Sequence, residues 1–474
     1  MTEAVAPDRA ARPGGRWSTP GLVDELLDLA AVERAAVHVA MGWVPKVPEL
    51  DDKLALAATI EDGMVRAVGL RQQALTLLER DDEALTVDPA VVVPLRRLDV
   101  AAAPDVVVDG VIGGAHRFLL ARHRALSTRL DPLYDARLLT VVRSAIDALE
   151  RSMSGAGPGA GPSPSGDEVL AALGRSWSTA SGDRASAVAL DEALWGPVDR
   201  VPVPARPSGR PRPEAGARAH LRSMSRLEHD DIAGELNDNV MAELSALELL
   251  CRCSYEHPEL PWSSHLALAR HIADEERHAA IFRRLLVERG YDEGELLQHG
   301  ANYEFAYEFP ECEPGSAHEL VWRLLILCTV LEALAIDKLP VEIASRDWLG
   351  QSDIARFLDY ISTDELFHTE NGLRLTRQLC EQHGLHPMLE RERVHGRFFG
   401  RQYAVRAAYL QADPERAARE IEILEGRDPD DMPFTSRTEV DLRRRASFTD
   451  EECEQVERWG YNPRRHPALD PAPG

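Results

Sequence analysis

The sequence predicts an all-α protein with two helical domains, of which the one later in the chain is a bundle of four long helices. Two observations support this prediction. Alanine, leucine, arginine and glutamate dominate the 474 residues, whereas alternating runs of β-branched residues are scarce. Apolar residues recur at helical spacing over long stretches, which proline- and glycine-rich segments separate. A chain of this length has room for two or three domains with sizeable cores.

Changes in composition divide the chain into five segments. The first has no apolar stretch of the kind found in a signal peptide and is expected to be disordered. The third is rich in glycine and proline, which predicts a flexible linker with one short helix near residues 168–173. The second and fourth are predicted to be amphipathic helices, and the fifth a helical extension with a polar end. The segments are the tail 1–17, the first helical domain 18–151, the linker 152–217, the bundle domain 218–380 and the C-terminal extension 381–474.

Four long helices are predicted in the bundle domain. A turn at Pro258 separates the first helix from the second, and a longer connection over residues 291–316 leads to the third. Phe398, Phe399 and Tyr403 are expected to pack the C-terminal extension against the bundle. The predicted helices cover residues 230–253, 263–290, 318–345 and 352–380.

The composition argues against several classes of function. A formal net charge of −25 repels a phosphate backbone, so nucleic acid is disfavoured as a partner. No stretch approaches twenty uncharged apolar residues, so we expect no membrane-spanning segment. The six cysteines are too scattered for a disulfide framework, and we expect reduced thiols and a cytoplasmic location.

Two Glu-x-x-His motifs carry the chemistry of the predicted bundle. Glu275 and His278 lie three residues apart in a predicted helix, so their side chains point the same way, about one turn apart. A carboxylate and an imidazole in this arrangement can bind one metal ion. A single pair of this kind is common on solvated helix faces, but the spacing recurs at Glu365 and His368. The repetition favours a metal site over a chance match.

A glutamate in an apolar setting precedes each motif. Glu243 lies 32 residues before Glu275, and Glu332 lies 33 residues before Glu365. In a pair of antiparallel helices, such a glutamate lies at the same depth as the motif that follows it. The rival on the first helix, Glu248, lies about 7.5 Å nearer the turn and points some 140° away from Glu243. We therefore predict Glu243 as the ligand.

The six predicted ligands form the set that dinuclear iron or manganese sites use in helix bundles. Four carboxylates offset two divalent ions, whereas zinc sites prefer nitrogen and sulfur ligands and calcium sites avoid imidazole. A salt bridge from Glu332 to Arg323 or Lys338 is the alternative, but it leaves the repeated spacing unexplained. The ligands are Glu243, Glu275, His278, Glu332, Glu365 and His368.

Polar residues beside the motifs are expected to support the ligands. Asp274 and Asp364 directly precede the ligand glutamates, and each is expected to accept the second N–H of a ligand histidine. The alternative is an exposed aspartate on the helix surface. Arg277 is expected to pair with one of these carboxylates, and Tyr360 to pack near the motif.

At these residues the chain resembles the ferritin-like superfamily of diiron carboxylate proteins. The stretch 274–278, Asp-Glu-Glu-Arg-His, is similar to the Asp-Glu-x-Arg-His motif of the bacterial multicomponent monooxygenases and of the ribonucleotide reductase small subunit. The stretches that begin at Glu243 and Leu331, together with the Asp364 motif, resemble a little-characterised bacterial ferritin-like family. The resemblance covers residues 230–380 well and the C-terminal extension loosely. It implies a ferritin-like four-helix bundle around a dinuclear metal site.

The first helical domain resembles a degenerate copy of the same bundle. Pro-Glu-Leu at 48–50 and the Leu-Ala-Leu-Ala that follows it parallel Pro-Glu-Leu at 258–260 and its own Leu-Ala-Leu-Ala. Residues 147–151, Asp-Ala-Leu-Glu-Arg, stand where a second metal motif would be. We infer a metal-free, pseudo-ferritin-like half; the alternative is chance similarity among helices rich in alanine and leucine. The alignment matches Glu33 with Glu243, Asp62 with Asp274, Gly63 with Glu275 and Arg66 with His278.

The resemblance implies O₂ activation by a reduced diiron centre. We expect a diiron oxygenase or hydroxylase of the monooxygenase type that oxidises a small molecule with two Fe ions; an Mn/Fe pair suits the same ligands. The expected partners are O₂, the substrate and an electron donor, either a reductase or a ferredoxin, and a homodimer is one expected assembly. Arylamine N-oxygenases of this superfamily add a histidine one turn before the last motif, where this chain has Ile361, so N-oxygenation is less supported.

Two other functions remain as alternatives. One is a non-catalytic or ferroxidase-type metal-binding protein, which the same six ligands would suit. The other is a tRNA-modifying diiron hydroxylase, since one ferritin-like enzyme has that role. It ranks last because of the negative net charge.

Overall fold

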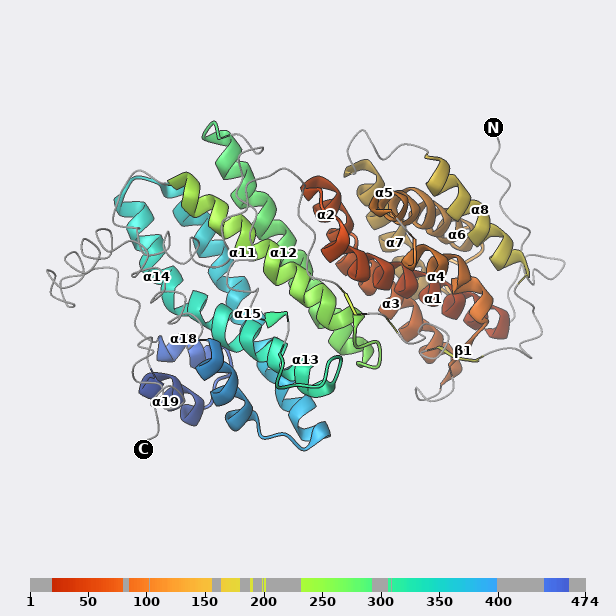
Figure 1. Cartoon of the computed structure of the whole chain (residues 1–474). Coiled ribbons are helices and arrows are strands. Elements are labelled where there is room, and N and C mark those ends of the chain that lie inside the picture. Colours follow the sequence, from red (N-terminus) through yellow and green to blue (C-terminus); the bar gives the residue numbers. More distant parts are fainter. Residues whose placement is uncertain are drawn as a thin grey trace, which may run out of the picture. The chain divides into compact units, whose positions relative to one another are not determined.

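The computed structural model of this protein confirms the all-α prediction (Figure 1). The only strands in the described part of the chain are β1 (Thr86–Val87) and β2 (Val188–Ala189), which pair antiparallel. No helix in the described ranges has the length and apolar character needed to cross a membrane. The structure describes residues 19–79, 85–101, 103–155, 163–179, 188–190, 198, 200–201, 232–291, 306–307, 309–398 and 439–459.

The chain divides into two compact units. The first comprises residues 1–208 and 250–276, and the second comprises residues 209–249 and 277–474. The predicted tail 1–17, residues 202–217 of the predicted linker, and Phe399 and Tyr403 of the extension lie outside the described residues.

The first unit is built around α1 (Thr19–Trp43). Nearly every residue of this helix is buried, because its apolar side chains are spread around the whole helix. Glu25 secures it to α6, since its Oε1 accepts hydrogen bonds from Arg122 at 2.8 Å and from Arg129, just beyond α6, at 2.7 Å. The other helices are α2 (Leu50–Ala57), α3 (Ile60–Leu78), α4 (Val93–Asp99), α5 (Pro104–Val108), the π-helix η4 (Asp109–Ala115), α6 (His116–Ser127), α7 (Ala136–Gly155) and α8 (Pro164–Thr179), with 3-10 turns η1 (Val44–Lys46) and η3 (Pro89–Val92).

The predicted linker is more helical than its composition indicates. The helix α7 continues to Gly155, and the short helix expected near residues 168–173 extends over all of α8. Leu173 and Trp177 explain the extra length, because both side chains are buried and Trp177 contacts the edge of Phe118. Packing of one apolar face therefore stabilises a helix in a segment with many glycines and prolines.

The four predicted helices of the bundle are present. The first two are α11 (Ile232–Tyr255) and α12 (Trp262–Glu288), and both contribute residues to the two units. The third consists of three parts, α13 (Ala317–Leu324), the π-helix η8 (Leu325–Leu331) and α14 (Glu332–Trp348). The fourth is α15 (Ser352–His383), which ends at Gly384 in the left-handed conformation with φ 66°.

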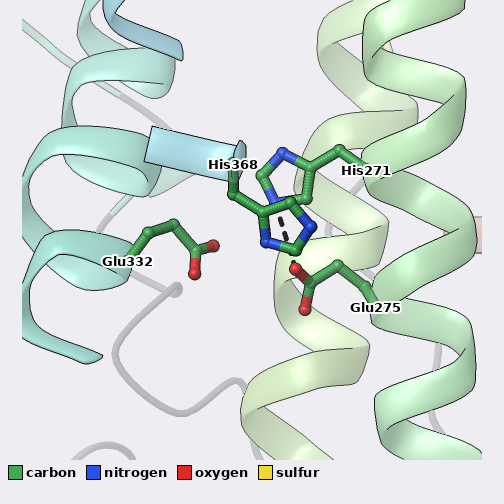
Figure 2. Close-up of side chains that lie close together, drawn as sticks. All are labelled: His271, Glu275, Glu332 and His368. Atoms are coloured by element: carbon green, nitrogen blue, oxygen red, sulfur yellow. Dashed lines mark ion pairs between the residues drawn. The ribbon is translucent and has the colours of Figure 1, made fainter. Parts of the chain in front are cut away.

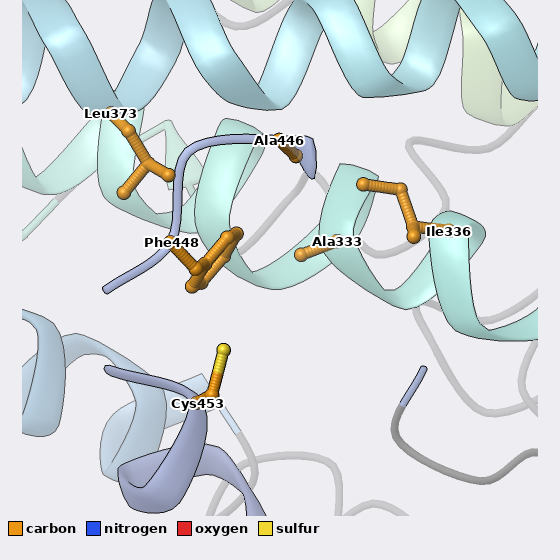
Figure 3. Close-up of a cluster of buried hydrophobic side chains, with 6 residues drawn as sticks. All are labelled: Ala333, Ile336, Leu373, Ala446, Phe448 and Cys453. Carbon is orange, nitrogen blue, oxygen red and sulfur yellow. The ribbon is translucent and has the colours of Figure 1, made fainter. Parts of the chain in front are cut away.

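The C-terminal extension packs against the third and fourth helices. It contains a helix over residues 387–398, α18 (Val440–Arg445) and α19 (Asp450–Trp459). Phe398 contacts Val330, in agreement with its predicted packing role. Arg443 donates a 2.6 Å hydrogen bond to the buried Asp337 and thereby links α18 to α14. The apolar cluster around this link is Ala333, Ile336, Leu373, Ala446, Phe448 and Cys453 (Figure 3).

Candidate metal centre

The six predicted ligands all lie on the long helices of the bundle. Glu243 is on α11, the first motif is on α12, Glu332 begins α14, and the second motif is on α15. Glu243 is half-buried, with 16% of its side chain exposed. The buried ligands are Glu275, His278, Glu332, Glu365 and His368.

The structure brings potential ligands together in two groups. Glu243, Glu275 and His278 form the first group, and each offers a ligand atom within 4.8 Å of the others. His271, Glu275, Glu332 and His368 form the second group under the same limit. Figure 2 shows His271 and Glu275 on one helix, with Glu332 and His368 directed toward them from other helices. Glu275 belongs to both groups, which is the position a carboxylate bridging two ions would take.

His271 is a potential ligand that the sequence reasoning missed. It lies four residues before Glu275 on α12 and is buried, and its Nε2 is 3.0 Å from Oε1 of Glu275. Residues at i and i+4 of a helix share a face, so the spacing from Glu275 is the one signal that the sequence gives for His271. In the pattern of the N-oxygenases the extra histidine would stand at Ile361, one turn before the second motif, whereas this chain has a histidine one turn before the first motif.

Glu365 lies beside the second group without belonging to it. Its side chain is buried, and its Oε2 is 3.6 Å from Nδ1 of His368. The rival Glu248 lies in neither group; its Oε2 accepts a 3.5 Å hydrogen bond from the hydroxyl of Tyr307.

Asp364 contacts a ligand histidine from the opposite motif. Its Oδ2 lies 3.2 Å from Nε2 of His278 and accepts a hydrogen bond from Arg277 at 3.0 Å, the pairing expected for that arginine. Arg277 also lies over the ring of the half-exposed Tyr360, 5.3 Å from its centroid. Asp274 is buried, and its contact with a histidine stays a prediction.

His278 lies in surroundings that stabilise a positive charge. Burial on its own lowers the pKa of an imidazole, but the carboxylates of Asp364 and Glu243 raise the pKa of His278 to about 9. Nε2 faces Asp364, whereas the buried Nδ1 makes no hydrogen bond to any described residue and lies 3.7 Å from Oε2 of Glu243. An imidazole oriented in this way presents Nδ1 to a cation, so these residues fit a metal ion.

A π-helix and a close helix contact position the second group. The π-helix η8 ends directly before Glu332, and π-turns of this kind occur frequently at functional sites. Gly372 lies one turn after His368, and a Cβ on it would be 2.0 Å from Cβ of Cys328 in η8. Only glycine allows α15 to approach η8 so closely, and this approach brings Glu332 and His368 together.

Comparison with known proteins shows which family the chain belongs to and nothing further. No curated protein and no solved structure matches the chain. One family model matches residues 176–415, just over half of the chain, and this range includes both groups of potential ligands. The chain belongs to the family described as "Protein of unknown function (DUF455)".

Proposed function

We propose that this chain is a diiron-dependent oxygenase with a ferritin-like four-helix bundle, which uses O₂ to oxidise a small-molecule substrate. The observation that carries the proposal is the shared position of Glu275 in two groups of histidine and glutamate ligands. Two ions joined by a carboxylate are the arrangement that carboxylate-rich bundle sites use. A structural zinc site would instead use four closed nitrogen and sulfur ligands.

The two groups assign different ligands to the two ions. One ion would be held by Glu243, Glu275 and His278, and the other by His271, Glu332, His368 and the shared Glu275. Glu365 is close enough to His368 to join the second set. The four glutamates offset the charge of two divalent ions, which compensates for burying them. The mixture of carboxylate and imidazole suits iron or manganese.

When bound in its reduced state, an iron pair supplies the electrons that activate O₂ for C–H or N–H oxidation. Asp364 holds the ring of His278 through Nε2, which leaves Nδ1 for the ion. Burial of the second group keeps bulk water from its ligands. Since His271 supplies a third imidazole, the isoleucine at 361 no longer argues against N-oxygenation, and the proposal covers both kinds of oxidation.

The first test is the metal content of the protein. Protein produced with iron should contain two Fe ions per chain by elemental analysis. Glu275→Ala should lose both ions because each group depends on this carboxylate. Glu276→Ala is the matched control on the next residue of the same helix and should keep both. Retention of two ions by Glu275→Ala, or their absence from the native protein, would refute the proposal.

A second measurement separates oxygenase from ferroxidase activity. The reduced protein is mixed with O₂ in the presence of candidate substrates, and O₂ consumption is followed with an oxygen electrode. An oxygenase consumes O₂ in proportion to the oxidised product. Consumption with Fe²⁺ alone that no substrate alters would favour the ferroxidase alternative.

A further inference from the structure

A seven-residue π-helix lies at the same point in two series of helices, which we call the N-terminal repeat (residues 19–155) and the C-terminal repeat (residues 232–383). In the N-terminal repeat η4 precedes α6, and in the C-terminal repeat η8 precedes α14. The helices α6 and α14 begin 216 positions apart, at residues 116 and 332, and the helices that follow them, α7 and α15, also begin 216 positions apart. π-Helices of this length are rare. Their shared place and spacing indicate an internal repeat.

Two spacings give five of the six proposed ligands a counterpart in the N-terminal repeat, and the sequence alignment, at a spacing of 210, pairs Glu33 with Glu243. The helices α2 and α12 begin 212 positions apart, the distance that also separates Gly63 from Glu275 and Arg66 from His278. On the last helix, the spacing of 216 corrects the sequence alignment of residues 147–151 by one position. The counterparts of Glu243, Glu275, His278, Glu332, Glu365 and His368 are Glu33, Gly63, Arg66, His116, Leu149 and Ser152.

Contacts between these counterparts follow the pattern of the metal centre. Arg66 contacts Glu33, just as His278 lies near Glu243. His116 Nδ1 lies 3.3 Å from Oγ of Ser152, just as Glu332 groups with His368. The counterparts therefore agree in their neighbours as well as in their positions along the chain.

A guanidinium supplies the positive charge in the N-terminal repeat. Nε of Arg66 donates a 2.9 Å hydrogen bond to Oε1 of Glu33, and Nε2 of His123 lies 3.0 Å from the same oxygen. All three side chains are buried. Burial alone would raise the pKa of Glu33, but Arg66 and His123 hold it at about 2. The negative charge of Glu33 is therefore already balanced by the guanidinium of Arg66.

Packing explains why the bridging glutamate has no equivalent. A Cβ on Gly63 would lie 2.6 Å from Cγ2 of Val37, so α3 approaches α1 too closely for a larger residue. The N-terminal repeat thus lacks both a bridging carboxylate at this position and the room for it.

We infer that the N-terminal repeat holds a second copy of the metal site in which the guanidinium of Arg66 takes the place of the ions. The ligand correspondence rests on the proposed function. The N-terminal repeat needs no metal to fold, because its buried carboxylate is neutralised within the chain. Replacement of Arg66 by histidine would leave Glu33, His123 and the new imidazole as ligands for one divalent cation such as Co²⁺.

The test is a Co²⁺ titration of the full chain under anaerobic conditions. Arg66→His should bind one Co²⁺ ion more than the native protein and gain visible absorption bands. Arg66→Lys, which keeps the positive charge, should gain no ion. The same ion count in native protein and folded Arg66→His would overturn the inference. A native protein that binds no Co²⁺ would refute the proposed function, while the gain in the variant would still decide this inference.

A second variant decides the question even if Arg66→His fails to fold. Glu33→Gln keeps the shape of the side chain and a hydrogen-bond acceptor for Arg66. It should leave the number of bound ions unchanged, whereas Glu243→Gln should lower it. A loss of ions in Glu33→Gln would show that the N-terminal repeat binds metal itself, contrary to the inference.

Discussion

At the scale of single residues, three side chains shape the proposed centre. Glu275 belongs to both groups of potential ligands, His271 adds a third imidazole, and the half-buried Asp364 orients His278. The repeated motif spacing was enough to predict that Glu275 and His278 lie together in one of these groups. It did not reveal His271, because a lone histidine on a helix has many other roles and becomes meaningful only when Glu332 and His368 are seen to face it.

His271→Ala should remove one of the two ions. His271 belongs to the second group alone, while the first group keeps all three of its members. Elemental analysis should therefore show about one ion per chain, since the four-ligand group loses a nitrogen donor. His265→Ala, six residues earlier on α12, is the control for loss of a buried imidazole and should keep both ions. A variant without His271 that still binds two ions with native affinity would exclude it as a ligand.

Asp364→Asn should weaken metal binding without abolishing it. The amide keeps an acceptor for His278 but loses the charge that holds both His278 and Arg277. Loss of such a partner of a ligand histidine typically costs about 10–100-fold in metal affinity. The affinity can be measured by competition with a chelator. Asp353 lies on the same helix as Asp364 and forms an exposed ion pair with Arg289. The substitution Asp353→Asn breaks this pair and should change the metal affinity little.

At the scale of elements, the helices were predictable and their departures from regular geometry were not. The predicted ends of α11, α12 and α15 agree with the structure to within a few residues, because prolines and glycines mark them. The π-helix η8 gives no such signal. The residues of η8 have the composition of any apolar helix. The wider turn of this π-helix lies where α15 approaches it closely, at Gly372, and that contact cannot be read from the sequence of η8.

Gly372→Ala should disturb the centre without touching a ligand. The new methyl group would overlap Cβ of Cys328, which forces α15 and η8 apart. Overpacking of this kind costs roughly 1–3 kcal/mol of stability. It should also weaken binding of the second ion more than of the first, because His368 lies on α15 and Glu332 directly follows η8. Urea unfolding and chelator competition test both effects, with the exposed Arg374→Ala as control. Native stability and metal affinity in Gly372→Ala would contradict the packing argument.

At the scale of the whole molecule, we propose two repeats whose buried carboxylates are neutralised differently, by Arg66 in the N-terminal repeat and by metal ions in the C-terminal repeat. Segments rich in glycine and proline were used to predict the domain boundaries, but the division into compact units follows the packing of the helices. Residues 250–276 belong to the first unit although they lie within the predicted bundle domain. Composition cannot reveal this, because the helices α11 and α12 that contain these residues are continuous.

Metal removal should therefore affect the two repeats unequally. Calorimetry of the loaded chain should show two transitions, and a chelator should lower the temperature of only one of them. At an ion concentration 100 times Kd, bound metal adds about 2.7 kcal/mol per site to stability. Glu275→Ala should show the lowered transition with or without chelator. Equal shifts of both transitions in the native chain would contradict a metal-independent N-terminal repeat.

The ion pair between Arg66 and Glu33 also bears on the order in which the protein is made. Both residues leave the ribosome before any of the proposed ligands, and the cation arrives as part of the polypeptide. At about 5–20 residues per second, the rest of the N-terminal repeat follows within a minute. Under the proposed function, the ligands of the C-terminal repeat must then obtain their ions from the cell. In iron shortage, we then expect newly made chains to accumulate with a folded N-terminal repeat and a C-terminal repeat that lacks its metal.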